Sequence, residues 1–326
     1  MSEDHAAEHG TKAVIAALAA NIGIAITKFI AYALTGSSSM LSEAIHSVVD
    51  SANQVLLLIG GKRARRDATP EHPFGYARDR YYYAFIVAIV LFSLGGLFAL
   101  YEAWHKFQDP HPIDSWKWVP IAVLLIAIVL ESFSLRTAVS ESNKVRKGLS
   151  WRRFVQRAKA PELPVILLED LGALIGLVFA LFGVSMTLIT GDGRWDALGA
   201  GMIGLLLCTI AIVLGRETKS LLMGESASDE DIVAIRGALA ANGFSDVIHL
   251  RTLHLGPDDI LVTAKVGAPA ALKLGELAQQ IDQAEAAIRG AVPDVRLIFL
   301  EPDVRRADGK GMSAGDAVTK ESGGTT

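Results

Sequence analysis

Residues 38–61 read SSMLSEAIHSVVDSANQVLLLIGG, which has the length of a membrane-spanning helix but carries polar side chains along its whole first half. About 20 apolar residues are needed to cross a bilayer. The polar residues here include Glu43, His46, Asp50, Asn53 and Gln54. Polar groups are costly in hydrocarbon unless they are hydrogen-bonded or wetted. This stretch therefore predicts a helix whose polar side faces the interior of a bundle.

The composition of the chain supports a polytopic membrane protein. The 326 residues are 51% hydrophobic, and the apolar residues are clustered. A single cysteine, Cys208, excludes an intramolecular disulfide and a multi-cysteine metal cluster. The apolar windows predict six spans, at 12–35, 40–60, 81–105, 116–138, 163–190 and 195–214.

The cations in the connecting segments predict the orientation. The segment 61–80 holds six of them and the segment 141–160 holds seven, whereas the three opposite loops hold zero, two and one. Cytoplasmic loops are enriched in Lys and Arg. Both termini are therefore expected in the cytoplasm, with the plasma (inner) membrane as the expected location. The N-terminus MSEDHAAEHG lacks the basic and then apolar start of a secretory signal, so the first span is expected to be retained.

The character of the chain changes after Arg216. A helix-like run at 229–242, strand-like runs at 245–255 and 259–267, a second helix at 272–291 and a last strand at 294–302 give the order αββαβ. This order predicts a small two-layer α+β domain with helices on one side of a sheet. The sequence thus predicts a polar tail at 1–11, a transmembrane domain at 12–216, a cytoplasmic domain at 225–303 and a disordered tail at 304–326.

His46 and Asp50 are the strongest candidates for chemistry in the second span. They are four residues apart, so on a helix they lie on one face about one turn apart. Glu43 and Gln54 extend the same face as a proton path or as partners of the ligands. An imidazole and a carboxylate in this arrangement suit Zn²⁺ or another first-row divalent cation. Inside a bilayer, ionisable residues are usually functional.

Glu169 and Asp170 form a second acidic feature, in the fifth span. Neighbouring helical residues point about 100° apart, so one of them is expected to be a ligand and the other a partner for a neighbouring helix or a proton carrier. A pair lying shallow in the membrane would instead neutralise the basic loop.

Four further polar residues are weaker candidates. Lys28 lies toward the end of its span, where a long side chain can reach the interface. Asn21 and Lys28 in the first span, and Glu131 with Arg136 in the fourth, are expected to form interhelical hydrogen bonds or ion pairs rather than to bind metal. Asn21 is also a candidate for the proton path.

The chain resembles the cation diffusion facilitator family, in particular its zinc-transporter-nine-like branch. The stretches that carry the resemblance are ANIGIAITKFIAYALTGSSSMLSEAIHSVVDSANQVLLLIGGKRA, HPFGYARDRYYYAFIVAIVLFSLGG, ESFSLRTAV and VILLEDLGALIGL. The resemblance covers about residues 12–302. It implies a membrane all-α six-helix bundle, a C-terminal ferredoxin-like α+β cytoplasmic domain, a homodimer, and export of a divalent metal cation driven by proton antiport.

The resemblance also implies site residues. By position, His46 and Asp50 match the family's second-helix ligands, and Asp170 matches its fifth-helix aspartate. The usual fifth-helix partner would stand at 166, where this chain has Ile166. Glu169 is similar to a residue of the zinc-transporter-nine-like branch and is expected to supply the missing donor. Zinc is the first choice of metal, with Mn²⁺, Fe²⁺, Co²⁺ and Ni²⁺ as alternatives.

Histidines are absent from the stretches of the soluble domain where many relatives bind regulatory metal. The second helix reads LGELAQQIDQAEAAIRG and the last strand LIFLEP, while His249 and His254 are five apart and should lie on opposite faces of their strand. The domain is therefore expected to dimerise without a metal cluster.

Two other classes of protein compete with a transporter. A membrane metalloenzyme would need a zincin-like HExxH motif or a general base beside an open metal position, and the sequence shows neither. A non-transporting metal sensor or scaffold would keep the fold and lose the site, and Ile166 leaves room for that alternative. No resident cofactor and no nucleic-acid partner are expected; the expected partners are the metal cation, protons, the lipid bilayer and a second copy of the chain.

Overall fold

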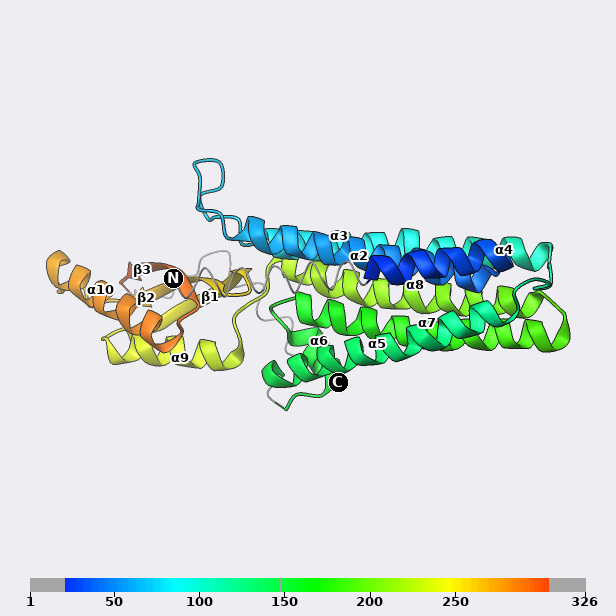
Figure 1. Ribbon diagram of the computed structural model, residues 1–326. Helices are drawn as coiled ribbons and strands as arrows, with labels where there is room; N and C mark the ends of the chain where they lie inside the picture. Colours follow the sequence, from blue (N-terminus) through cyan, green and yellow to red (C-terminus); the bar gives the residue numbers. More distant parts are fainter. Residues whose placement is uncertain (1–20, 147, 305–326) are drawn as a thin grey trace, which may run out of the picture. The chain divides into compact units, whose positions relative to one another are not determined.

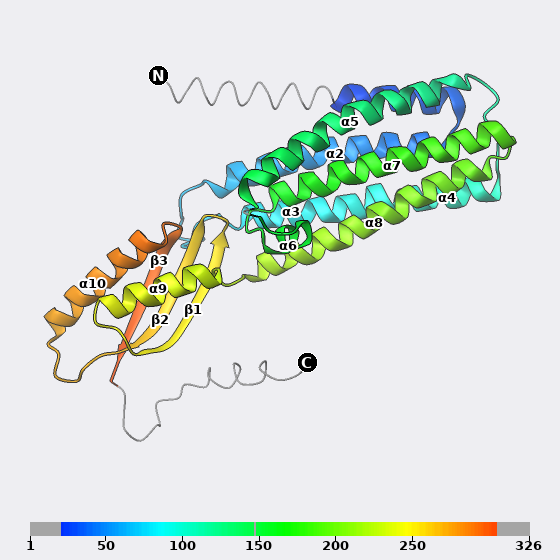
Figure 2. The same ribbon diagram turned by 90° about the horizontal axis from the view of Figure 1, so that it is seen from below.

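The computed structural model describes residues 21–146 and 148–304, and the chain divides into two compact units at Met223–Gly224. The first unit is a bundle of helices that run side by side (Figures 1 and 2). The second is a small α+β domain. The predicted tail at 1–11, residues 12–20 of the first predicted span and residues 305–326 of the second tail lie outside the described residues.

Four helical stretches of the first unit are long and apolar enough to cross a membrane. The first stretch, Asp79–Gln108, comprises α3 (Asp79–Val90), η1 (Leu91–Leu97) and α4 (Phe98–Gln108). The other three are α5 (Trp118–Val145), α7 (Glu162–Thr190) and α8 (Arg194–Met223). The four stretches correspond to the last four predicted spans, of which 116–138 begins two residues before α5. The second predicted span is helix α2 (Ser38–Ala64), and the first is seen as the helix Asn21–Thr35. The membrane is therefore crossed several times, and the count of six crossings stays a prediction.

The basic segment predicted at 141–160 is not a plain loop. Helix α5 continues to Val145, and a short helix, α6 (Trp151–Arg157), follows. The hydroxyl of Ser150 caps α6 by accepting a hydrogen bond from the backbone N–H of Arg153. The guanidinium of Arg146 lies 4.4 Å from the centre of the Trp151 ring. These two local contacts explain the extra helix, which hydrophobic periodicity does not reveal in so short a segment.

The start of α2 is fixed by a single buried carboxylate from α8. Asp196 accepts hydrogen bonds from the Ser37 hydroxyl at 2.8 Å, the Ser38 N–H at 2.6 Å and the Ser39 N–H at 3.2 Å. The first N–H groups of a helix have no intrahelical acceptor, and a negative charge at this end is favourable. The N-terminal end of the polar helix is thus held against α8.

Close helix contact depends on glycine where α8 meets the segment η1–α4. A Cβ at Gly204 would lie 2.8 Å from the backbone nitrogen of Leu100 and 3.0 Å from the carbonyl oxygen of Gly96. Neither atom belongs to a flexible side chain, so the backbones themselves would have to separate. The π-helical turn Leu91–Leu97, which contains Gly96, lies at this contact.

The second unit consists of α9 (Asp229–Ala241), β1 (Val247–Gly256), β2 (Asp259–Gly267), α10 (Leu274–Ala291) and β3 (Val295–Asp303). The predicted element order αββαβ is confirmed. The sheet order is β1-β2-β3, with β1 antiparallel and β3 parallel to β2. The parallel pair requires a crossover, which α10 supplies. The helices α9 and α10 cover one face of the sheet (Figure 2).

Alternation along the strands places the core on the helix side. Ile260, Val262, Ala264 and Val266 of β2 are buried, and the residues between them are partly exposed. His254 pairs with Ile260 and is buried on the same side, whereas His249 pairs with Lys265 on the other side. The two histidines thus lie on opposite faces, as predicted.

We expect Gly204→Ala to lower the stability of the helical unit, because it forces two backbones apart at a tight contact. Overpacking of this kind typically costs about 1–3 kcal/mol, so the thermal unfolding midpoint of the detergent-solubilised protein should fall. Gly201→Ala is the matched control in the same helix, since its Cβ would meet only Ala103 Cβ at an ordinary 3.5 Å. Equal midpoints for the two variants would contradict the tight crossing.

Candidate metal site between α2, α5 and α7

The polar residues of α2 face the inside of the bundle. Glu43, His46 and Asn53 are 0%, 1% and 0% exposed, whereas the apolar Val48 and Leu58 of the same helix are 45% and 49% exposed. The polar side of α2 is therefore the buried side, as the sequence predicts.

His46 and Asp50 lie next to each other, with Nδ1 of His46 3.5 Å from Oδ1 of Asp50. Among the described residues, neither ring nitrogen of His46 nor this Asp50 oxygen has a hydrogen-bond partner, although all three atoms are buried. Most buried polar atoms in proteins are hydrogen-bonded, and each exception asks for an explanation. A nitrogen and an oxygen donor left open on one helix face are suited to bind a cation.

Glu169 and Asp170 of α7 point to different neighbours, as their 100° separation predicts. Glu169 Oε1 accepts a hydrogen bond of 2.6 Å from the Asn53 amide of α2. Asp170 Oδ2 accepts one of 2.8 Å from the Ser134 hydroxyl of α5. Both carboxylates are thus positioned by side chains from neighbouring helices.

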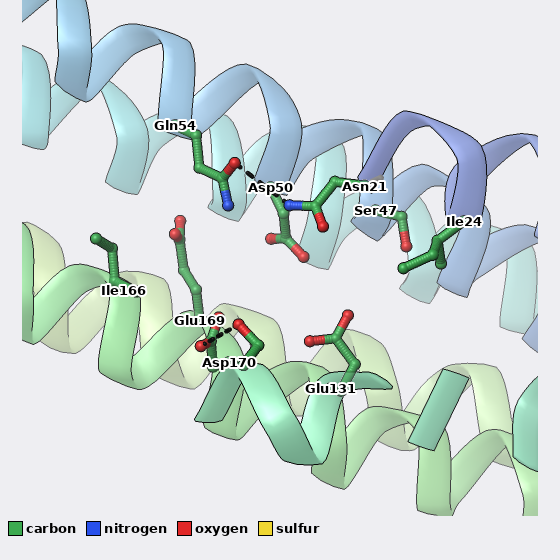
Figure 3. Close-up of a pocket in the computed structure, with 10 residues that line it drawn as sticks. Asn21, Ile24, Ser47, Asp50, Gln54, Glu131, Ile166, Glu169 and Asp170 are labelled. Atoms are coloured by element: carbon green, nitrogen blue, oxygen red, sulfur yellow. Dashed lines mark hydrogen bonds between the residues drawn. The ribbon is translucent and has the colours of Figure 1, made fainter. Parts of the chain in front are cut away.

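A small cavity of about 20 Å³ connects these groups (Figure 3). Its lining includes four carboxylates from three helices: Asp50 of α2, Glu131 of α5, and Glu169 and Asp170 of α7. The volume suffices for one water molecule or one ion. In Figure 3 the Asp50 carboxylate points across the gap toward Glu131 and Asp170.

The four predicted ligands are only partly assembled. Asp50, Glu169 and Asp170 share the cavity, whereas His46 is not part of its lining. Within residues 21–146 and 148–304, no three His, Cys, Asp or Glu side chains lie close enough together to hold a metal ion. The side chains are therefore neighbours, but they do not form a closed coordination shell.

The residues predicted to flank the site make interhelical contacts. The Asn21 amide donates a hydrogen bond of 3.3 Å to Gln54 Oε1, and both residues line the cavity (Figure 3). Lys28 does not reach a membrane interface: it is fully buried, and its Nζ lies 3.0 Å from Glu43 Oε2. The expectation of interhelical hydrogen bonds and ion pairs is confirmed for Asn21 and Lys28. The expectation that Lys28 extends to the interface is wrong, because Glu43 provides a buried counter-charge.

Glu131 and Ser134 were not predicted as part of this site. The sequence suggested that Glu131 and Arg136 form interhelical hydrogen bonds or ion pairs and do not bind metal, whereas Glu131 lines the cavity beside Asp170. Glu131 and Ser134 are three residues apart on α5 and share a face. The sequence signal that could have predicted their place in the site is an acidic residue and a hydroxyl three residues apart within an apolar span.

Comparison with known proteins finds a family and several relatives to which the chain is similar. Residues 14–223 match the family described as the cation efflux transmembrane domain. The human proton-coupled zinc antiporter SLC30A9, mitochondrial, is 32% identical over 258 residues, which cover 78% of this chain and 45% of that protein. The zinc transporter ZitB of Yersinia pestis is 26% identical over 248 residues, which cover 76% of this chain and 74% of that protein. The chain thus spans about half the length of the mitochondrial relatives it matches.

A solved structure of a MamM-CTD variant also resembles part of the chain. It is 21% identical, with a TM-score of 0.22, and covers 23% of this chain and 92% of that one.

We expect Asn53→Ala to destabilise the bundle, because it removes the amide that donates to the buried Glu169 carboxylate. Leaving a buried acceptor unpaired costs about 1–3 kcal/mol, which thermal unfolding in detergent would detect. Gln54→Ala is the control, since its half-buried amide makes only the longer 3.3 Å bond. If Gln54→Ala lowers the unfolding midpoint as much as Asn53→Ala does, the Asn53–Glu169 hydrogen bond contributes no more to stability than the Asn21–Gln54 bond.

Proposed function

Because the chain belongs to the cation efflux family, a family of transporters rather than enzymes, we propose that it exports a divalent metal cation from the cytoplasm in exchange for protons. Zn²⁺ is the first choice of cargo. The observation that carries the proposal is the cavity between α2, α5 and α7, into which these three helices place four carboxylates. His46, whose ring nitrogens make no hydrogen bond to the described residues, lies beside one of them, Asp50. Ionisable groups at such a position mark an ion path.

The proposed ligands are His46, Asp50, Glu169 and Asp170. One imidazole and several carboxylates form a harder donor set than a two-histidine site, so Mn²⁺, Fe²⁺, Co²⁺ and Ni²⁺ remain alternative substrates. Asp50, Glu169 and Asp170 already face one cavity, and His46 lies one helical turn from Asp50. A bound cation would draw His46 toward these carboxylates and complete the site.

Exchange with protons follows from the chemistry of the ligands. A carboxylate or an imidazole binds a metal only in its deprotonated form, so metal and protons compete for the same side chains. If the site opens alternately to the two sides of the membrane, an inward proton gradient drives the metal outward. Glu43, Asn21 and Gln54 are the proposed route or supporting partners. Glu43 and Gln54 continue the polar face of α2 on both sides of His46 and Asp50, and Asn21 donates a hydrogen bond to Gln54 from the preceding helix.

The remaining features of the proposal rest on the sequence. Six transmembrane helices with both termini in the cytoplasm agree with the cation-rich segments 61–80 and 141–160. The plasma (inner) membrane stays the proposed location. The αββαβ unit is proposed to be a cytoplasmic ferredoxin-like domain through which two copies of the chain form a homodimer.

Metal flux into proteoliposomes under an imposed pH gradient tests the function. We expect Zn²⁺ transport by the wild type and a loss of at least about tenfold in His46→Ala and in Asp50→Ala, since each removes a proposed ligand. The matched control is His111→Ala, because His111 also pairs with an aspartate, Asp109, at 3.0 Å but at an exposed position.

The outcomes separate the alternatives. Unchanged flux in His46→Ala and Asp50→Ala would overturn the assigned site. Absence of flux with every divalent cation, in protein that is folded, would favour a sensor or scaffold.

Ile166→His tests why this chain lacks a second imidazole. Ile166 lines the cavity together with Glu169 and Asp170, so a histidine there would add a nitrogen donor. We expect the preference for Zn²⁺ over Mn²⁺ to rise, because imidazole suits Zn²⁺ whereas carboxylates suit Mn²⁺. Competition between the two metals in the flux assay measures this preference, and an unchanged ratio would place residue 166 outside the metal's reach.

A further inference from the structure

Lys28 forms a buried ion pair directly beside the proposed metal site. Its Nζ donates to Glu43 Oε2 at 3.0 Å and to the Ser47 hydroxyl at 2.8 Å, and both charged side chains are 1% exposed or less. Ser47 also lines the cavity that holds the carboxylates. The ammonium group is therefore separated from that cavity by one hydroxyl group.

The two residues of α2 that Lys28 contacts lie on either side of His46 in the sequence. Glu43 and Ser47 stand three residues before and one residue after His46. The second carboxylate oxygen of Glu43, Oε1, is buried without a hydrogen-bond partner. It lies against Gly176 of α7, where an added Cβ would come within 2.7 Å of it.

We propose that Lys28 is a built-in cation of the transport site, which engages Glu43, keeps it out of the metal's ligand set and limits the affinity of the site for the transported ion. The inference rests on the proposed function. A transporter must release its cargo as well as bind it, and a fixed positive charge beside a cluster of carboxylates weakens their hold on a divalent cation in a low-dielectric interior. Lys28 supplies that charge within the site.

The net charge of the Lys28–Glu43 pair predicts the order of metal affinity among the variants. At a pH that keeps Glu43 deprotonated and Lys28 protonated, the Lys28–Glu43 pair is neutral in the wild type, negative in Lys28→Met, neutral again in the double variant Lys28→Met with Glu43→Gln, and positive in Glu43→Gln alone. If Lys28 acts through its charge, metal affinity should be highest in Lys28→Met, lowest in Glu43→Gln and intermediate in the wild type and the double variant. We expect a change of about tenfold or more at each charge step, because a unit charge close to a divalent cation is weakly screened inside a protein.

The measurement is equilibrium binding of Zn²⁺ to the full chain in nanodiscs, with Zn²⁺ efflux from pre-loaded proteoliposomes as a second readout. Lys28→Met should bind Zn²⁺ more tightly and turn over more slowly. If Lys28 only holds the helices together, Lys28→Met will lower the unfolding midpoint without tightening the binding of Zn²⁺. The matched control is Lys106→Met, since Lys106 is also buried but donates to the carbonyl oxygen of Gly36 at 3.0 Å.

The failure of this inference is distinguishable from the failure of the proposed function. If the wild type binds Zn²⁺ and His46→Ala abolishes binding, while Lys28→Met has wild-type or weaker affinity, then the role of Lys28 is overturned and the transport site stands. If the wild type binds no divalent cation, the proposed function itself is overturned. Recovery of near-wild-type affinity in the double variant, after tightening in Lys28→Met, supports the inference even if the single variant is less stable.

Discussion

The need to satisfy polar groups inside an apolar bundle governs the arrangement of this molecule. Helix α2 brings a row of ionisable and amide side chains into a region where water does not compensate them. Three residues outside α2 supply partners for it: Lys28 pairs with Glu43, Glu169 accepts from Asn53, and Asp196 accepts from the N-terminal end of the helix. The ring nitrogens of His46 and one oxygen of Asp50 stay without hydrogen-bond partners among the described residues. Both side chains have the ligand chemistry of a divalent metal.

Repulsion between carboxylates explains why the four that line the cavity come from separate helices. Four carboxylates on one helix face would repel one another in both the folded and the unfolded chain. Distributed over α2, α5 and α7, they are brought together only when the helices pack, and hydrogen bonds from Asn53 and Ser134 offset part of the repulsion. A cation in the cavity would stabilise this packing further, so binding and helix association are coupled.

The sequence predicted what depends on spacing along one helix and missed what depends on pairing between helices. The one-turn separation of His46 and Asp50 and the divergence of Glu169 and Asp170 follow from helical periodicity, and both are seen. The place of Glu131 in the cavity could not be derived, because it depends on how α5 packs on α7. The same holds for the counter-charge of Lys28, which is 15 residues away on another helix. In the second unit, strand alternation and turn residues are local signals, and its element order was predictable for that reason.

The hydrogen bonds to Asp196 fix the N-terminal end of α2, so a tilt of this helix would pivot at that end. Three hydrogen bonds to one carboxylate fix Ser37–Ser39, whereas the amide of Asn53 makes one bond to α7. With a rise of 1.5 Å per residue, Asn53 lies about 21 Å from the anchored end. A tilt of about 10° around Asp196 would move Asn53 by about 4 Å, and the anchor hardly at all. A rotation about Asp196 would therefore displace Asp50 and Gln54, which line the cavity, more than it would displace Ser38.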